Sequence, residues 1–458
     1  MHSNQRLIAG ILAGTLIGVT TSVSLNVFAF KQSVDEQALP LEQLQKFTEV
    51  YARVQQDYVE TPDGKEMMTN AIRGMLTGLD PHSDYLDEEA FKELQVGTSG
   101  EFGGLGIEVG MEDGFVKVIS PIDDTPAQRA GLAAGDLIIR LDDKPVKGMT
   151  LNDAVKVMRG KPGTAIELLV VREGKDKPFT VSITRDVIKV QSVKSRLLEE
   201  GYGYVRISSF QSRTTESMLE ALDQLKEENK GNLKGIVLDL RNNPGGVLNA
   251  AVGVSDAFLE NGKIVYTEGR VDDAQMEYNA RSGDELDGAP IVVLVNQGSA
   301  SASEIVSGAL QDHKRALILG QQTFGKGSVQ TVLPLDEKTA LKLTTARYFT
   351  PNGRSIQAEG IKPDIEIRPL KLDANANGEE EIAPLAEKDF AKHLSNPTQS
   401  EEAAPAATDT EQQTAPMEVK KGEAKDKSLA EEDYQLYEAL NILKGMNLVL
   451  DRSKKDAS

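Results

Sequence analysis

Between residues 203 and 369, segments with the pattern of strands alternate with segments with the pattern of helices, and this alternation limits the fold more than any other feature of the chain. Short runs rich in Val, Ile and Leu predict strands at residues 204–207, 235–240, 291–295, 316–319, 328–333 and 340–349. Helical spacing predicts helices at residues 214–228, 247–259 and 300–312. Alternation of this kind predicts an α/β core, because helices cover the apolar faces of the sheet.

The stretch from residue 97 to 185 has a different pattern, with short strands separated by glycine turns. It contains the runs 102–109, 125–132 and 135–141, then an expected helix at 151–158 and a strand at 165–172. Several motifs therefore follow one another in a fixed order, which is more specific than a single glycine loop. This part of the chain resembles a PDZ domain.

Helical segments flank these two parts. At the N-terminal side, apolar residues at helical spacing (Leu41, Leu44, Phe47, Tyr51, Val54 and Tyr58) predict an amphipathic helix whose stripe packs on a core or on another subunit. A second helix is expected near residues 65–79. At the C-terminal side, residues 428–431 form a capping box, and the leucines that follow line one helical face. An isolated helix is marginal in water, so it must dock on its own domain, another subunit or a separate protein.

The first thirty residues predict export. Arg6 precedes a long apolar run that ends in small residues near Ala29, as in a secretory signal, and an uncleaved membrane anchor is the alternative. The net charge of −20 argues against nucleic acid as a partner. The absence of cysteine excludes disulfides, thiolate catalysis and Cys-ligated zinc. Residues 371–427, rich in Ala, Glu, Pro and Thr, predict a disordered acidic linker.

A serine-rich turn, residues 296–304, lies between an expected buried strand and an expected helix. In α/β proteins such turns lie at the edge of the sheet where functional sites form. Ser301 would stand at the helix N-terminus, where free N–H groups stabilise a developing oxyanion. The alternative is an ordinary helix cap, because Ser301 and Glu304 also fit a capping box.

A nucleophilic serine needs a base, and the four histidines are poorly placed for that role. His2 lies in the export segment, His393 lies in the acidic linker, and His313 lies roughly 18 Å along the helix that begins at Ser301. His82 lies in a turn, and only tertiary folding would bring it close. A lysine is the other candidate, since burial lowers the pKa of an amine and makes it a base.

Lys326 is the best candidate lysine because Gly325 and Gly327 let its backbone approach another segment closely. Its alternative is a solvated lysine in a turn. Gln330 lies four residues further on. In a straight strand their Cα atoms would be roughly 13 Å apart, so a role for Gln330 in orienting Lys326 requires a bend.

Three runs together resemble the carboxyl-terminal processing peptidases, also called tail-specific proteases: residues 299–304, 325–327 and 239–246. The order of the parts is similar as well, and the resemblance covers roughly residues 40–370. It implies a crotonase-like fold and a nucleophile twenty-five residues before the lysine, which selects Ser301 over Ser299 and Ser303. It also implies that Lys326 is the base and that Gln330 orients it.

The same resemblance implies an oxyanion hole formed by the N–H of Ala302 and a glycine of the 244–246 loop. We prefer Gly245 to Gly246. Without the resemblance, this loop is equally well a tight turn into the following helix. Asp312 matches an acidic position in some relatives, and we expect it to be a structural residue at the helix end. No cofactor or metal is expected.

In PDZ domains, a glycine-rich turn before a strand offers N–H groups to a peptide carboxylate, and the peptide then adds as a strand. The corresponding residues are Leu105, Gly106 and Ile107, with Leu105 and Ile107 lining an apolar pocket. Ordinary core packing is the alternative for Ile107. Arg159 lies where some relatives couple the PDZ domain to the protease core, although we favour a solvated residue at a helix end.

The sequence thus predicts an α/β crotonase-like protease core with an inserted PDZ domain and helical N- and C-terminal extensions. The expected parts are a signal peptide or anchor (1–30), a helical region (31–96), the PDZ domain (97–185), the Ser-Lys protease core (186–370), the acidic linker (371–427) and a C-terminal helix (428–458). These boundaries follow the changes in composition and pattern along the chain.

The predicted function is an exported serine endopeptidase of the bacterial periplasm or cell envelope that cleaves proteins recognised by their exposed C-termini. Expected partners are those protein substrates, a second copy of the chain bound through the terminal helices, and an adaptor protein; the N-terminal segment would give association with the inner membrane. The alternatives are a catalytically silent PDZ-containing binding protein of the same fold and a scaffold held together by its terminal helices.

Overall fold

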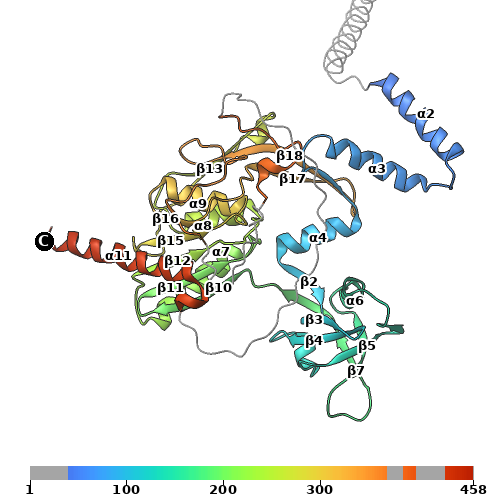
Figure 1. Ribbon diagram of the computed structural model, residues 1–458, viewed down its shortest axis with the longest axis horizontal. Coiled ribbons are helices and arrows are strands. Elements are labelled where there is room, and N and C mark those ends of the chain that lie inside the picture. The colour runs from blue at the N-terminus through green and yellow to red at the C-terminus, as the bar shows by residue number, and fades with distance from the viewer. Residues whose placement is uncertain (1–39, 369–384, 399–428, 457–458) are drawn as a thin grey trace, which may run out of the picture. The chain divides into compact units, whose positions relative to one another are not determined.

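The computed structural model describes residues 40–368, 385–398 and 429–456 (Figure 1). The chain divides into two compact units, residues 1–72 and 73–458, which are described separately. In the first unit, α2 (Leu41–Asp57) confirms the predicted helix, and none of its residues is buried. The expected signal or anchor, residues 1–30, lies outside the described residues. Among the helices that are described, none has the length and apolar character to cross a membrane.

The centre of the second unit is a six-stranded sheet. Its order is β10 (Val193–Glu199), β11 (Tyr202–Ile207), β12 (Gly235–Asp239), β15 (Ile291–Val295), β16 (Ala316–Gly320) and β19 (Ile365–Glu366). The strands from β11 to β19 are parallel, and β10 adds antiparallel at one edge. The predicted α/β core is therefore confirmed, and the carboxyl ends of its parallel strands meet at one edge.

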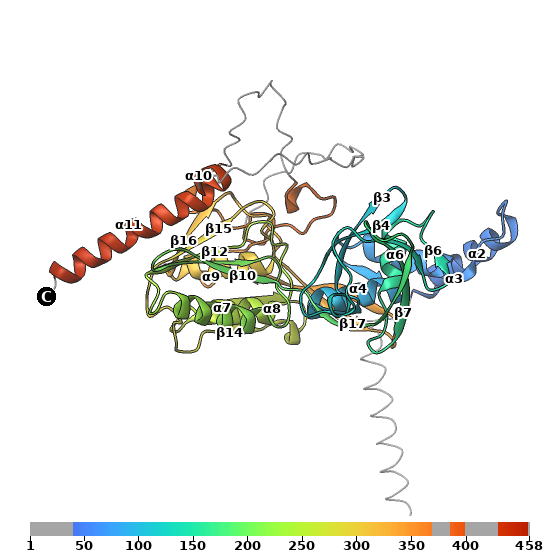
Figure 2. The same ribbon diagram turned by 90° about the horizontal axis from the view of Figure 1, so that it is seen from below.

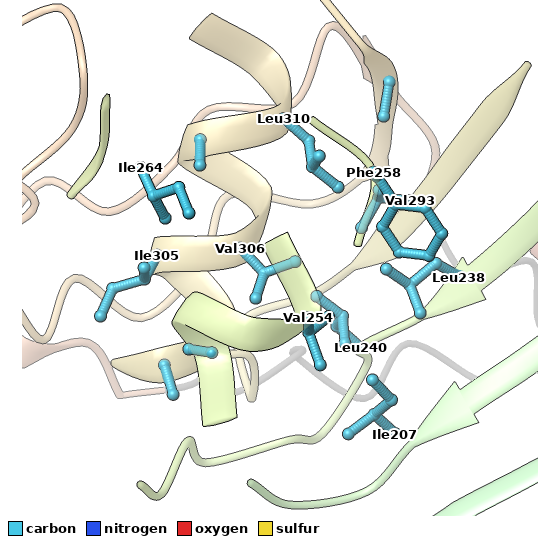
Figure 3. Close-up of a cluster of buried hydrophobic side chains, with 14 of the residues drawn as sticks. Ile207, Leu238, Leu240, Val254, Phe258, Ile264, Val293, Ile305, Val306 and Leu310 are labelled. Atoms are coloured by element: carbon cyan, nitrogen blue, oxygen red, sulfur yellow. The ribbon is translucent and has the colours of Figure 1, made fainter. Parts of the chain in front are cut away.

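Helices cover both faces of this sheet, because alternate residues of its strands point to opposite faces. Leu238 and Val293 face a core formed with α7 (Thr214–Glu228), α8 (Leu248–Asp256) and α9 (Ala302–Asp312), part of which Figure 3 shows. The alternate residues Val237 and Val292 face α11 (Tyr434–Asp456). Figure 2 shows α11 on the side of the sheet opposite α7 and α8.

The C-terminal helix therefore docks on its own domain. Leu436, Leu440 and Leu443 are at most 3% exposed and pack against the sheet. The sequence left three possible partners for this apolar face, namely its own domain, another subunit or a separate protein, and in the structure the face packs on its own domain. The short helix α10 (Leu429–Glu432) precedes α11.

A second, antiparallel sheet lies beside the α/β core. Its order is β1 (Asp84–Leu86), β18 (Ala340–Phe349), β13 (Lys263–Gly269) and β14 (Glu277–Asn279), and β17 (Ser328–Pro334) also pairs with β18. The sequence predicted β17 and β18 but not β1, β13 or β14. β1 and β17 pair with opposite edges of β18, so Thr344 of β18 lies between Asp80 and Gln330 and is hydrogen-bonded to both.

The PDZ domain has its own apolar core. Its strands are β3 (Ile107–Glu112), β4 (Phe115–Pro121), β5 (Leu137–Leu141), β6 (Lys144–Pro145), β7 (Ala165–Val171) and β8 (Phe179–Thr184), with helices α5 (Pro126–Arg129) and α6 (Leu151–Met158). The flanking strands β2 (Glu101–Gly104) and β9 (Asp186–Lys189) pair with each other. The chain thus enters and leaves the domain through neighbouring strands, as expected of an insertion.

One prediction about the C-terminal side was wrong in part. Residues 385–398 fall within the expected disordered linker, yet they pack on the protease core and include the 3-10 helix η2 (Glu387–Asp389). Glu387 is completely buried and hydrogen-bonded. The prediction was based on the polar composition of this stretch, which does not show that residues elsewhere in the chain hydrogen-bond the Glu387 carboxylate and so compensate its burial. The rest of the predicted linker, residues 371–384 and 399–427, lies outside the described residues.

Candidate active site

Ser301 lies where β15 leads into α9, at a turn with strained backbone. Its φ of 55° and ψ of −110° are unusual for a residue with a side chain, and the residue is 8% exposed. Such angles persist only where surrounding contacts enforce them, and they cluster at functional sites. The backbone N–H of Glu304, in the first turn of α9, donates to the carbonyl oxygen of Ser301 at 2.9 Å. This N–H therefore does not need the Ser301 hydroxyl as its acceptor.

Glu304 joins the serine turn to the lysine turn. Its Oε2 accepts the backbone N–H of Ser301 at 2.7 Å and the backbone N–H of Lys326 at 2.9 Å. Its Oε1 accepts the N–H of Gly325 at 2.7 Å and the hydroxyl of Thr323. The two turns therefore lie side by side, although the side chains of Ser301 and Lys326 share no hydrogen bond among the described residues.

The Lys326 amine is held at the start of β17. Its Nζ donates to Gln330 Oε1 and, at 3.4 Å, to the carbonyl oxygen of Ser328. Burial lowers the pKa of Lys326 to about 8, although the negative charges of Glu387 and Glu304 oppose that change. A lysine with this pKa has a sizeable neutral fraction near neutral pH and can act as a base.

Lys326 and Gln330 come together as expected, because Lys326 lies in the turn just before β17 and its amine reaches Gln330 Oε1 within that strand. The pairing of β17 with β18 shifts register between Val329 and Gln330, where Thr345 is the extra residue on β18. The amide nitrogen of Gln330 donates to Ser328 Oγ at 3.0 Å and to Thr344 Oγ1 at 3.2 Å, so its carbonyl oxygen is left to face the amine.

The loop proposed for the oxyanion hole lies against Ser301. A Cβ added at Gly245, whose φ is 103°, would come within 2.8 Å of Ser301 Cβ and 3.0 Å of the Ala302 nitrogen. Only glycine fits this approach. The Ala302 N–H has no acceptor among the described residues, whereas the Gly245 N–H donates to Asn243 Oδ1 at 2.9 Å. To donate to an oxyanion, the Gly245 N–H must first break its hydrogen bond to Asn243 Oδ1.

The histidines take different positions. His82 Nε2 lies 2.8 and 2.9 Å from the two carboxylate oxygens of Glu387. His313 Nε2 bonds the carbonyl oxygen of Lys263 at 2.7 Å, at the far end of α9. Asp312, also at that end, accepts from the Asn352 N–H and pairs with Arg354, the structural role expected of it.

In the PDZ domain, Gly106 has the left-handed backbone conformation that favours glycine in a turn. Its φ is 77°, and a Cβ there would meet Thr125 at 2.3 Å. The N–H groups of Leu105 and Gly106 find no acceptor within the described residues. Leu105 is 2% exposed and packs in the core of the domain, and Ile107 is partly exposed. Arg159 is exposed at the end of α6, as favoured from the sequence, and its guanidinium lies 4.6 Å from the ring centroid of Phe102.

Four residues of this centre were not identified as functional from the sequence: Asp80, Glu304, Thr344 and Glu387. Glu304 looked like half of a capping box, and Asp80 looked like part of a helix break. The only signal available for Glu304 was its place inside the serine-rich run. For Glu387 there was none, because its partners are distant in the sequence, from 30 residues away for Gln357 to 305 for His82.

Comparison with known proteins agrees with this organisation. Residues 201–367 match the family described as Peptidase family S41, residues 103–183 match the PDZ domain, and residues 9–90 match the activating protease CtpB N-terminal domain. The carboxy-terminal-processing protease of Bartonella bacilliformis is 46% identical over 429 residues, which is 93% of this chain and 94% of that protein. The carboxy-terminal processing protease CtpA of Bacillus subtilis is 37% identical over 70% of this chain and 68% of its own length.

Among solved structures, the photosystem II D1 C-terminal processing protease is 32% identical, with a TM-score of 0.41, and the match covers 72% of this chain and 95% of that one. The α/β core and the PDZ domain, with the family match over each, define a serine peptidase of family S41 that carries a PDZ domain. The identity over nearly the whole length goes further: the chain belongs to the carboxy-terminal-processing proteases.

Proposed function

We propose that this protease is exported and cleaves its protein substrates with Ser301 as nucleophile, Lys326 as general base and Gln330 as the residue that orients the base. The observation that carries the proposal is the hydrogen bonding around Glu304. One carboxylate oxygen accepts the backbone N–H groups of both Ser301 and Lys326, which fixes the two turns next to each other.

The bonds made by the amine suit a base. A neutral amine has two N–H donors and one lone pair, and the acceptors Gln330 Oε1 and the Ser328 carbonyl oxygen engage two donors. The lone pair is then free to take the proton of the Ser301 hydroxyl as its oxygen attacks the scissile carbonyl. The protonated amine then gives this proton to the leaving peptide nitrogen, so the C-terminal fragment departs and Lys326 is neutral again. In the second half of the reaction, water attacks the acyl-enzyme and passes its proton to the same amine, which returns it to the Ser301 oxygen as the acid product leaves.

We assign the oxyanion hole to the N–H groups of Ala302 and Gly245. The Ala302 N–H is free of protein acceptors among the described residues, and Gly245 lies against the Ser301 side chain. The Gly245 N–H becomes available when its bond to Asn243 Oδ1 breaks. Two backbone donors of this kind stabilise the negative charge of a tetrahedral intermediate.

The substrates that fit this enzyme are proteins with exposed C-termini. The free N–H groups at Leu105 and Gly106, with Ile107 beside them, suit a terminal carboxylate followed by an uncharged side chain. Export is supported by the sequence of residues 1–30. Assembly through the terminal helices would have to use α2 or the exposed end of α11, because the leucine face of α11 is already buried.

The test is to label the protein with a serine-reactive fluorophosphonate and to map the modified peptide by mass spectrometry. We expect the label on Ser301, its loss in Ser301→Ala and its retention in Ser303→Ala, the matched control from the same turn. Lys326→Ala should slow labelling by about a hundredfold or more, because it removes the base. Labelling on another serine in the wild-type protein would contradict the assignment.

A further inference from the structure

Residues 385–398 form a short segment that is built into the protease core. The carboxyl group of Glu387 is completely buried, and the Phe390 ring lies against the Phe324 ring with centroids 6.0 Å apart. The mechanism described above makes no use of this segment. A fully buried charge is costly unless it is paired, so its contacts call for an explanation.

Glu387 is bonded to both ends of the turn that carries the base. Its backbone N–H donates to the carbonyl oxygen of Phe324 at 3.1 Å, just before Lys326. Its Oε1 accepts Gln357 Nε2 at 3.1 Å, and Gln357 Oε1 accepts the N–H of Gly327 at 3.1 Å, just after Lys326. The segment therefore fixes the turn from both sides.

The same carboxylate reaches the residues that hold Gln330. The Glu387 carboxylate is hydrogen-bonded to His82 Nε2, and the backbone N–H of His82 donates to Asp80 Oδ1 at 2.8 Å. Asp80 Oδ1 also accepts Thr344 Oγ1 at 3.0 Å, and Thr344 Oγ1 accepts from the Gln330 amide at 3.2 Å. The network thus ends on the amide that binds the amine of the base.

The charges in this centre are unevenly distributed around the amine. Glu387, Glu304 and Asp80 act on Lys326 as negative groups when ionised, and Lys342 acts as a positive one. Burial raises the pKa of Glu304 to about 7, so Glu304 itself titrates near neutral pH, in wild type and Glu387→Gln alike. Burial raises the pKa of Glu387, but its bonds to His82 and Gln357 and the charge of Lys326 together bring it below its usual value. Glu387 is therefore ionised at neutral pH and faces two cationic or titratable groups, His82 and Lys326.

We propose that Glu387 is a positioning residue for the catalytic base: it fastens the turn that carries Lys326 and places a fixed negative charge that holds the proton on the amine. The inference rests on the proposed role of Lys326 as the base. A negative charge near an amine favours its protonated form, so Glu387 keeps the base from becoming neutral until the pH is higher. Residues 385–398 are then part of the active centre and not of a linker.

The test compares Glu387→Gln with Asp389→Asn, measuring kcat/KM for an unfolded protein substrate across the pH range in which lysine titrates. Glu387→Gln removes the charge and keeps one acceptor, so the rising limb should move to lower pH by roughly one unit. Asp389 is exposed and bonds the Ala386 N–H in the same segment, so its change is a matched removal of charge that should leave the limb in place. Equal limbs for wild type and Glu387→Gln, together with an unmoved ionisation midpoint of Lys326 itself, would overturn the inference.

A second measurement separates this inference from the proposed function. In a Ser301→Ala background, competitive acetylation followed by mass spectrometry of the Lys326 peptide reports the ionisation of the amine without any need for activity. We expect Glu387→Gln to lower the midpoint. A lower midpoint with an unmoved activity limb would support the role of Glu387 and contradict Lys326 as the base. An unmoved midpoint would overturn the role of Glu387 and leave the base assignment standing.

Discussion

Arg241 and Asp433 are joined by two hydrogen bonds of 2.9 and 2.6 Å, although 192 residues separate them in the sequence. Arg241 also bonds the buried carboxylate of Asp239 at the end of β12. The loop that contains Gly245 begins directly after Arg241. The C-terminal helical segment is therefore tied to the loop assigned to the oxyanion hole.

This relationship predicts the effect of Asp433→Asn. Loss of the charged bond should lower the free energy of unfolding by about 1–2 kcal/mol, because hydrogen bonds to charged groups are worth more than neutral ones and solvent screens this partly exposed pair. The pKa of Asp433 is lowered by its bonds and by the charge of Arg241, which outweigh burial. Its contribution is thus present above the unfolded pKa and lost as the pH falls through the folded one.

Chemical denaturation at neutral and acidic pH checks this. The stability difference between wild type and Asp433→Asn should disappear at acidic pH. Glu432→Gln, an exposed neighbour, is the control and should match the wild type. A difference that persists in acid would show that the charge of Asp433 is not the cause.

Glu304→Gln should reduce cleavage by about a hundredfold or more while the protein still folds. The amide NH₂ group of a glutamine donates hydrogen bonds, whereas both carboxylate oxygens of Glu304 accept them. In Glu304→Gln this NH₂ group would face either the two N–H groups that now bond Oε2 or the donors that now bond Oε1, and donor would meet donor. The turns of Ser301 and Lys326 would then separate, and small displacements of reacting groups are costly. Ser303→Ala, in the same turn, is the control for general damage. Wild-type kcat in Glu304→Gln would refute the positioning role.

The pH profile should show a lysine and not a histidine. The rate rises as Lys326 loses its proton, and because burial lowers the pKa of Lys326 to about 8, the rising limb of kcat/KM should lie near that value, below the ordinary lysine value of 10.5. Initial rates on a fluorescent peptide across the pH range measure this. A limb near the ordinary histidine value of about 6.5 that vanishes in His82→Gln would identify His82 as the base instead.

Recognition by the PDZ domain should require a free C-terminus. Two peptides of one sequence, one with a free carboxylate and one amidated, should differ in cleavage, with the amidated one poorer. Gly106→Ala should remove that difference, because the added methyl group would collide with Thr125 and distort the turn. Binding of a few residues is weak but raises the local concentration of substrate. Equal cleavage of both peptides by the wild type would exclude the domain from substrate selection.

The sequence predicted most of the core because its strands and helices are long, apolar and regularly spaced. It missed β1 and β13, which pair with β18, and β14, which pairs with β13; the pairing partners of these strands are distant in the sequence or carry little apolar pattern. Gln330 is instructive: the sequence suggested its pairing with Lys326 only if the two side chains could meet, and in the structure the Lys326 amine donates to Gln330 Oε1.

The predictions that failed involve burial that composition does not reveal. Glu387 lies in a polar, low-complexity stretch, and only its bonds to His82 and Gln357 make its burial tolerable. The burial of Leu105, which is 2% exposed in the core of the PDZ domain, was likewise not visible in the local pattern. Both outcomes depend on contacts between distant residues, which local patterns do not encode.

The central claim, that Ser301 and Lys326 act as one catalytic unit, is tested most directly by cleavage of an unfolded protein by wild type, Ser301→Ala, Lys326→Ala and the double variant. Members of such a unit are not additive, so each single variant should lose as much activity as the double variant, with unchanged circular dichroism. Full cleavage by either folded single variant would contradict the account.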